Sequence, residues 1–236
     1  MKNPPKKGRN TVNNGLGSTA PVPDDGDGPE LMDIINRSRA ADGRIRVPDE
    51  FAPARDYIVK AMQTIGLLQL QVDAISRTAG AIVSALRNRR KILTCGNGGS
   101  AAEAMHLAEE LTGKYHKPRR ALPAICLCAD PTALTCIAND WDFSQVFSRQ
   151  VEALAGKGDV LVLFTTSGNS ENCLKAARAM RKAGGRVIGM LGKDGGKAKA
   201  LCDLALVVQA DRTNHIQEAH QVVLHLILEA VEAAFS

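Results

Sequence analysis

From residue 91 onward, the chain alternates short apolar runs with longer helical patterns, and this feature constrains its fold more than any other. An apolar run of five or six residues is typical of a strand buried on both faces, because such a strand has no solvent side. Helix-length connections allow each new strand to run parallel to the last. We therefore predict an α/β fold with a parallel sheet covered by helices on both faces.

The apolar runs predict strands at 91–95, 124–128, 159–164, 186–191 and 204–208. The patterns between and after them predict helices at 100–112, 131–139, 143–155, 169–183 and 214–235. Residues 52–90 carry apolar residues at helical spacing, which predicts one long N-terminal helix with Gly66 and Gly80 as its candidate breaks. An apolar stripe outside the sheet needs a partner, so this helix favours packing between subunits.

The N-terminal region differs in composition from the rest. Five of the ten prolines and five glycines lie within residues 1–30, with almost no apolar clusters. Such a composition cannot build a core, so we predict a mostly disordered extension over residues 1–50 and one domain over residues 51–236.

Charge and cysteine usage narrow the function class. The net charge of +5 is mild and unpatterned, which argues against dedicated nucleic-acid binding and suits a sugar phosphate equally well. There is no apolar run of 18 residues and no signal-peptide core, so we expect no membrane segment and a cytoplasmic protein. The six cysteines lie mostly in apolar segments, as expected for buried thiols in a reducing compartment.

Two polar turns follow predicted strands and open predicted helices. The first is Gly96-Asn97-Gly98-Gly99-Ser100, and the second runs from Thr165 to Ser170 with four hydroxyl groups. Ser100 and Glu103 have the spacing of a capping box, which predicts where the first helix begins. Ordinary capping would explain one such turn, but two at the same sheet edge favour a phosphate site. Neither turn matches a nucleotide-binding motif.

Polar residues also interrupt two otherwise apolar helices. His106 and Glu110 are four apart and share a helix face, whereas Glu109 is expected to point elsewhere into solvent. In the last helix, polar residues step by four at Gln217, Gln221 and His225. A single histidine on an apolar face is usually a core residue, and we expect this of His220. His106, Glu110 and His225 together indicate an acid/base or metal cluster.

Several segments together resemble a known family. They are GNGGSAAEAMHLAEELTGKY, IANDWDFSQVFSRQVEAL, GDVLVLFTTSGNSENCLKAA, LGKDGGK and IQEAHQVVLH. In this order they resemble the phosphoheptose isomerases of the sugar-isomerase (SIS) domain family over residues 52–235. The resemblance implies a flavodoxin-like, three-layer α/β/α fold with a five-stranded sheet. It also implies a homotetramer with active sites between subunits, and conversion of sedoheptulose 7-phosphate to D-glycero-D-manno-heptose 7-phosphate for surface glycans such as lipopolysaccharide.

The resemblance also implies roles for individual residues. Glu110 and His225 would be the acid/base pair. One zinc ion per subunit would be held by His106, Glu110, Gln217 and His225. The substrate would contact Asn97, Gly98, Gly99, Ser100, Lys114, Asn139, Asp140, Thr165, Thr166, Ser167, Ser170 and Gln217. Three positions depart from the family pattern and bear on the sugar-hydroxyl contacts: Lys114 replaces arginine, Asn214 replaces aspartate and Thr165 replaces serine.

Two other functions share this fold. A non-catalytic relative binds the replication initiator protein, and SIS-domain sensors bind sugar phosphates for regulation. The initiator-binding relative lacks the carboxylate and the histidine that stand here as Glu110 and His225, which favours the enzyme. Sensors usually append a helix-turn-helix domain, and residues 1–50 are too rich in proline and glycine to form one.

Overall fold

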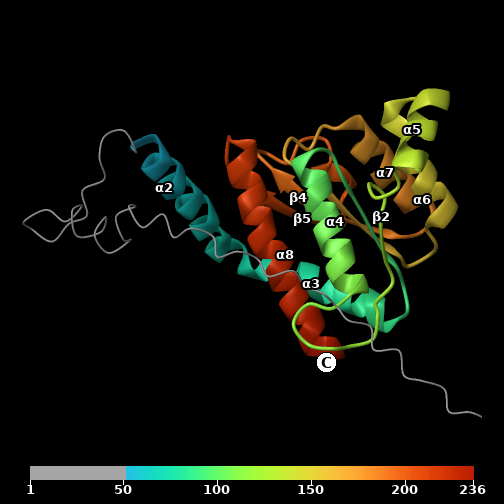
Figure 1. Ribbon diagram of the computed structural model, residues 1–236, viewed down its shortest axis with the longest axis horizontal. Helices are drawn as coiled ribbons and strands as arrows, with labels where there is room; N and C mark the ends of the chain where they lie inside the picture. Colours follow the sequence, from blue (N-terminus) through green and yellow to red (C-terminus); the bar gives the residue numbers. More distant parts are fainter. Residues whose placement is uncertain (1–51) are drawn as a thin grey trace, which may run out of the picture. The chain divides into compact units, whose positions relative to one another are not determined.

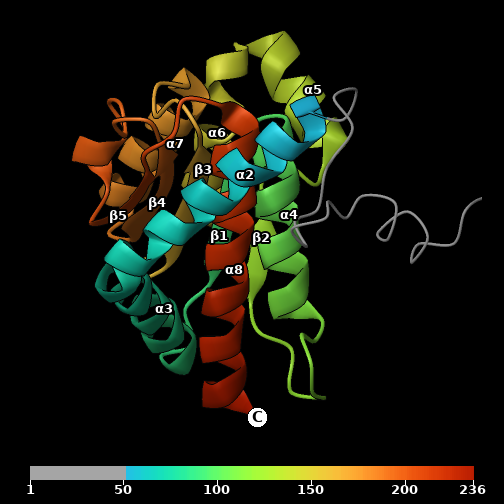
Figure 2. The same ribbon diagram turned by 90° about the vertical axis from the view of Figure 1, so that its left-hand side faces the viewer.

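The computed structural model describes residues 52–236, so the extension predicted for residues 1–50 lies outside the described part. Residues Pro53–Ser236 form one compact unit. In this unit a parallel sheet is sandwiched between two layers of helices (Figures 1 and 2). The predicted α/β/α architecture is confirmed.

The five strands lie in the order β2-β1-β3-β4-β5, and every neighbouring pair is parallel. They are β1 (Ile92–Gly96), β2 (Ala124–Cys126), β3 (Val160–Thr165), β4 (Arg186–Gly192) and β5 (Leu204–Val208). Every residue of β1 and β3 is buried, as continuous apolar runs predict for strands covered on both faces. Each strand overlaps one of the five strands predicted from the apolar runs.

The helices divide into two layers with separate cores. One core lies between the sheet and α3 (Val72–Arg87), α4 (Gly99–Thr112) and α8 (Thr213–Phe235). The other lies between the sheet and α5 (Pro131–Asp140), α6 (Ser148–Leu154) and α7 (Glu171–Lys182). Figure 2 shows α8 and α4 side by side in front of the sheet. No helix in residues 52–236 is long and apolar enough to cross a membrane.

The long N-terminal helix is interrupted at the first of its two candidate breaks. Helix α2 (Ala52–Gly66) ends in a 3-10 segment, η2 (Leu67–Gln71), before α3 begins, and Gly80 lies inside α3 without a break. Helix α3 buries six residues against α8 and the sheet, whereas α2 buries only Thr64. Large apolar side chains are therefore exposed here: Ile58 by 57%, Met62 by 67% and Leu70 by 84%.

One predicted helix is shorter than expected. The pattern over 143–155 forms a 3-10 turn, η3 (Phe143–Gln145), followed by α6. The Asp142 carboxylate accepts the Ser144 N–H at 2.8 Å and holds this turn apart from the helix. The spacing of apolar residues does not predict such a local side-chain cap.

Candidate functional site

The two polar turns meet where β1 and β3 end side by side at the carboxyl edge of the sheet. The chain leaves β1 towards β2 and later returns to β3 on the other side of β1, so this is the point at which the strand order reverses. Open α/β sheets bind ligands at such a point. A pocket of about 290 Å³ lies there. It is lined by Asn97, Gly98, Gly99, Ser100, Phe164, Thr165, Thr166, Ser167, Ser170, Thr213 and Gln217.

Backbone geometry explains the glycines of the first turn. Gly98 has φ +57°, which side-chain-bearing residues rarely adopt, and α4 begins at the next residue. A Cβ at Gly96 would run into the backbone carbonyl of Ser100. The tight turn therefore brings backbone N–H groups of the α4 N-terminus to the pocket wall.

The capping box predicted for Ser100 and Glu103 is wrong. Helix α4 begins at Gly99 without any side-chain cap, because the turn at Gly98 already sets the start. Glu103 is instead buried, with Oε1 3.6 Å from Nδ1 of His220. The other ring nitrogen of His220 lies 3.0 Å from the Leu191 carbonyl oxygen, so His220 is a core residue, as predicted.

The second turn is held in place by its own hydrogen bonds. Thr165 Oγ1 accepts the Gly168 N–H at 3.2 Å, and Gly168 has φ +63°. The Asn97 and Asn172 side-chain amides exchange two hydrogen bonds, of 2.9 and 2.8 Å, which tie the two turns together. Asn172 is nearly fully buried.

Three helices begin around this pocket. Gly99 is the first residue of α4, Ser170 directly precedes α7, and Thr213 is the first residue of α8. Each helix start presents free N–H groups and the positive end of its dipole, and the surrounding hydroxyl groups add donors. Gln217, from the first turns of α8, lies 3.5 Å from Ser100 Oγ. The pocket therefore has the donor set of a phosphate site, although no lysine or arginine among residues 52–236 lines it.

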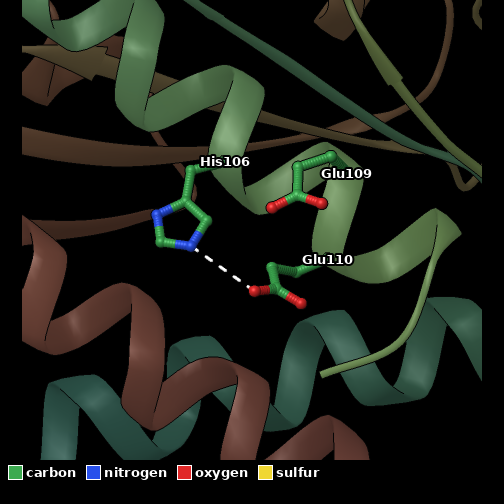
Figure 3. A group of neighbouring side chains, drawn as sticks. All are labelled: His106, Glu109 and Glu110. Atoms are coloured by element: carbon green, nitrogen blue, oxygen red, sulfur yellow. Dashed lines mark ion pairs between the residues drawn. The ribbon is translucent and has the colours of Figure 1, made fainter. Parts of the chain in front are cut away.

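A second polar group lies further along α4. His106 Nε2 is 3.6 Å from Glu110 Oε1, and donor atoms of His106, Glu109 and Glu110 all lie within 4.8 Å of one another (Figure 3). Glu109 is exposed, as expected, but its carboxylate lies close to the other two rather than away from them. The rest of the donor set comes from α8.

Helix α8 orients His106 and places another histidine beside it. His106 Nδ1 lies 3.1 Å from Gln221 Oε1, an oxygen that can accept a ring N–H, and Nε2 on the other side of the ring faces Glu110. The His225 ring meets the His106 ring edge-on, with centroids 5.4 Å apart, and stacks at 6.2 Å from Tyr115. His225 is exposed, although its sequence neighbours are apolar.

The residues predicted to act together thus form two groups on parallel helices. Gln217 lies with Ser100 in the pocket, whereas His106, Glu110 and His225 lie further from the sheet edge. Ser100 and Glu110 are ten positions apart on α4, about 15 Å at the usual helical rise. Within one chain, Gln217 does not join the histidines and carboxylates.

Three predicted substrate contacts lie outside both groups. Lys114 is exposed just beyond the end of α4, and Asn139 and Asp140 are exposed at the end of α5. Asn139 Nδ2 donates to Asp140 Oδ1 at 2.8 Å. None of the three lines the pocket of about 290 Å³.

Sequence reasoning missed Arg119, which fixes the end of α4. Its guanidinium donates to the carbonyl oxygens of Glu110 at 2.6 Å and Leu111 at 3.0 Å. Its side chain is fully buried, and Nε lies 3.5 Å from Glu232 Oε2 on α8. Arg119 therefore joins the helix that carries His106 and Glu110 to the helix that carries His225. No spacing rule marks a loop arginine for this role.

Two other residues that position site side chains, Gln221 and Asn172, were only partly predictable from the sequence. Gln221 belongs to the row of polar residues that steps by four along the last helix. Asn172 follows the second hydroxyl-rich turn, but nothing in the sequence pairs it with Asn97.

Comparisons with known proteins identify relatives of this chain. The model of the SIS domain family matches residues 56–192. A phosphoheptose isomerase from a Nitratiruptor species is 52% identical over 153 residues, covering 65% of this chain and 82% of that protein. The structure of phosphoheptose isomerase from Neisseria gonorrhoeae is similar with a TM-score of 0.71 and 39% identity, covering 78% of this chain and 98% of the other. The corresponding structure from Francisella tularensis has a TM-score of 0.73 and 32% identity, with the same coverage.

Proposed function

The chain belongs to the phosphoheptose isomerases of the SIS domain family, and from this membership we propose that it converts sedoheptulose 7-phosphate to D-glycero-D-manno-heptose 7-phosphate. The observation that carries the proposal is the pocket in which three helix starts and two hydroxyl-rich turns converge. That arrangement suits the phosphate that marks one end of the substrate.

The phosphate is bound mainly by neutral donors. The hydroxyl groups of Ser100, Ser167 and Ser170 and the N–H groups at the helix starts surround the pocket. Because the pocket is set into the sheet edge, these donors are already in place before the ligand arrives. Binding at this end anchors the sugar, so the reacting carbons at the other end are positioned by it.

The reaction moves a carbonyl from C2 to C1 through an enediol. Glu110 takes a proton from C1 and returns one to C2, which a carboxylate can do near neutral pH. His225 moves protons between the two oxygens, as an imidazole can within the same pH range. Both groups are carried on the facing sides of α4 and α8, so they can flank the reacting carbons.

We further propose a homotetramer whose active sites lie between subunits. A seven-carbon sugar phosphate spans roughly 10 Å from C1 to phosphorus at ordinary bond lengths, which is less than the separation of about 15 Å along α4. A substrate in the pocket of one chain would therefore reach the Glu110 of a neighbouring chain. The exposed apolar side chains of α2 and η2 support such packing, since within residues 52–236 nothing covers them.

The donor groups on α4 fit a zinc ion. Two ligands of a tetrahedral zinc ion lie roughly 3–3.5 Å apart, and His106 Nε2 and Glu110 Oε1 are 3.6 Å apart. We propose His106, Glu110 and His225 as ligands, with Gln217 supplied across a subunit contact, and one ion per subunit. When bound, such an ion polarises a carbonyl and stabilises negative charge on its oxygen.

The alternatives are weaker. A binding protein for the replication initiator does not need a carboxylate–histidine cluster on facing helices, and this chain has one. We place the reaction in the cytoplasm because all six cysteines are free thiols. Its product would supply the heptose of surface glycans such as lipopolysaccharide.

The test is direct. Purified protein is incubated with sedoheptulose 7-phosphate, with added zinc and separately with a chelator, and the aldoheptose 7-phosphate is followed by NMR. We expect product with zinc and its loss with the chelator. Product that is insensitive to the chelator would remove zinc from the proposal. No product under any metal condition, from a folded oligomer, would overturn the isomerase.

A further inference from the structure

Two cysteines lie together at the end of the edge strand β2. Cys126 is its last residue, and Cys128 follows in the turn after it. The Cys128 N–H donates to Cys126 Sγ at 3.4 Å. The Cys128 S–H donates to the carbonyl oxygen of Gly96 at 3.3 Å. The second thiol is thus a neighbour of the first and also touches the start of the glycine turn.

Cys126 is reachable from outside. It is partly exposed and lines a cavity of about 460 Å³ together with Met105, His106 and Glu109. By contrast, Cys95 and Cys173 are buried in the core and have no such access. Cys136, on α5, is more exposed than Cys126.

The surroundings of Cys126 and Cys136 differ in charge. The neighbouring Cys128 side chain, against the opposing effect of burial, lowers the pKa of Cys126 to about 6, and the Cys128 backbone N–H, which donates to Cys126 Sγ, adds to this. The Asp140 carboxylate, which accepts the Cys136 S–H, raises the pKa of Cys136. The thiolate is the reactive form of cysteine, so the more exposed thiol is the less reactive one.

We propose that Cys126 is a peroxide-reactive thiol and that Cys128 resolves it to a disulfide. The Cys126 thiolate attacks one oxygen of hydrogen peroxide, forming an S–O bond while the O–O bond breaks and hydroxide leaves, taking up a proton as water. The Cys128 sulfur then attacks the sulfenic acid, forming the S–S bond as the S–O bond breaks and a second water leaves. A bridge between residues two apart is strained, and strained bridges are readily reduced, so the step is reversible by thiols.

Oxidation should change the structure of the phosphate pocket. The bridge removes the S–H that Cys128 donates to Gly96, and Gly96 opens the turn whose next four residues line the pocket. We expect weaker binding of sugar phosphate in the oxidised form. Only this consequence rests on the proposed function, because the thiol chemistry itself is independent of the isomerase.

The test uses the wild-type chain, so its result does not depend on whether a variant folds. Reduced protein is treated with increasing hydrogen peroxide, remaining thiols are blocked with a light alkylating reagent, and reversibly oxidised ones are then reduced and labelled with a heavy one. Mass spectrometry should show Cys126 and Cys128 oxidised together, at lower peroxide than Cys136, and restored by dithiothreitol. Oxidation of Cys136 at the same or lower dose, or of Cys126 without Cys128, would overturn the proposal.

Two variants sharpen the result. In Cys128→Ser the reaction should stop at a sulfenic acid on Cys126, which dimedone traps, whereas wild-type protein traps little. The matched control is Cys136→Ser, which removes the more exposed thiol and should leave peroxide sensitivity unchanged. Equal trapping in wild type and Cys128→Ser would show that Cys128 does not resolve Cys126.

Discussion

The pocket of about 290 Å³ and the His106–Glu110–His225 cluster lie on the same two helices but are built in different ways. The pocket is formed by turns of the backbone at the ends of two buried strands, and one chain supplies its wall. The cluster is formed by side chains on partly exposed helix faces, with His225 open to solvent. We therefore expect binding to be a property of the single chain and chemistry to require an assembly.

The largest expected effect separates the two regions most sharply. Glu110→Gln removes the proposed base, and turnover should fall roughly 100- to 10,000-fold, as expected when general base catalysis is lost. Affinity for inorganic phosphate, measured by calorimetry, should not change because the pocket is about 15 Å away. Glu109→Gln is the matched control and should stay within a few-fold of wild type. Comparable losses in both variants would remove Glu110 as the base.

A mixed oligomer tests whether the two regions act across chains. Ser167→Asp places a carboxylate in the pocket and should abolish phosphate binding by like-charge repulsion. Glu110→Gln chains and Ser167→Asp chains should each be inactive alone. When they are unfolded together and refolded, mixed oligomers should regain measurable turnover. If mixing restores nothing, each active site is contained in one chain.

A milder change in the pocket should affect binding only. Ser167→Ala removes one hydroxyl donor to an anion, and a hydrogen bond to a charged group contributes about 1.5–3 kcal/mol. We expect KM to rise roughly tenfold or more with kcat nearly unchanged. Ser84→Ala, on the exposed side of α3, serves as the control and should leave both constants as they are. A lower kcat with unchanged KM would place Ser167 in the chemistry.

The cluster depends on how the end of α4 is held. Arg119→Lys keeps a positive charge but loses the planar fork that donates to the Glu110 and Leu111 carbonyls. Turnover should fall roughly several-fold through misplacement of Glu110, while phosphate affinity stays constant. Steady-state kinetics and phosphate calorimetry on the same preparation check this. Loss of phosphate affinity in parallel would show a general loss of structure.

The smallest effect concerns the partner of Arg119. Donation by the Lys117 N–H, and secondarily the charge of Arg119, holds the pKa of Glu232 below its usual range. Ionised Glu232 therefore stabilises the fold above its unfolded pKa of about 4.3, and this contribution is lost as the pH falls through the folded-state pKa. Glu232→Gln should lower the Tm at pH 7, and the difference from wild type should shrink in melts as the pH falls below about 4.3 and through the lower folded-state pKa.

Most of the pocket could be predicted from the sequence because its residues are contiguous. Each polar turn directly follows an apolar run, and parallel strands carry such turns to one edge, so Asn97–Ser100 and Thr165–Ser170 must lie near each other. For the same reason, the five strands and most of the helices between and after them were predictable from period and length alone. The cluster was predictable only as a helix face, His106 with Glu110.

Other features were decided by tertiary contacts. The long helix breaks at Gly66, where η2 begins and the chain turns into α3, whereas Gly80 lies on the exposed side of α3 and remains helical. Glu103 forms no cap because Gly98 starts α4 and the buried His220 provides a partner. Gln221 contacts His106 and Arg119 contacts Glu232, and each pair is more than 100 residues apart in the chain. Arg119 also lies in a loop, where no helical or strand periodicity predicts its position. Local patterns in the sequence therefore predict the layers and the two polar turns, whereas the packing of α4 against α8 selects which polar side chains meet.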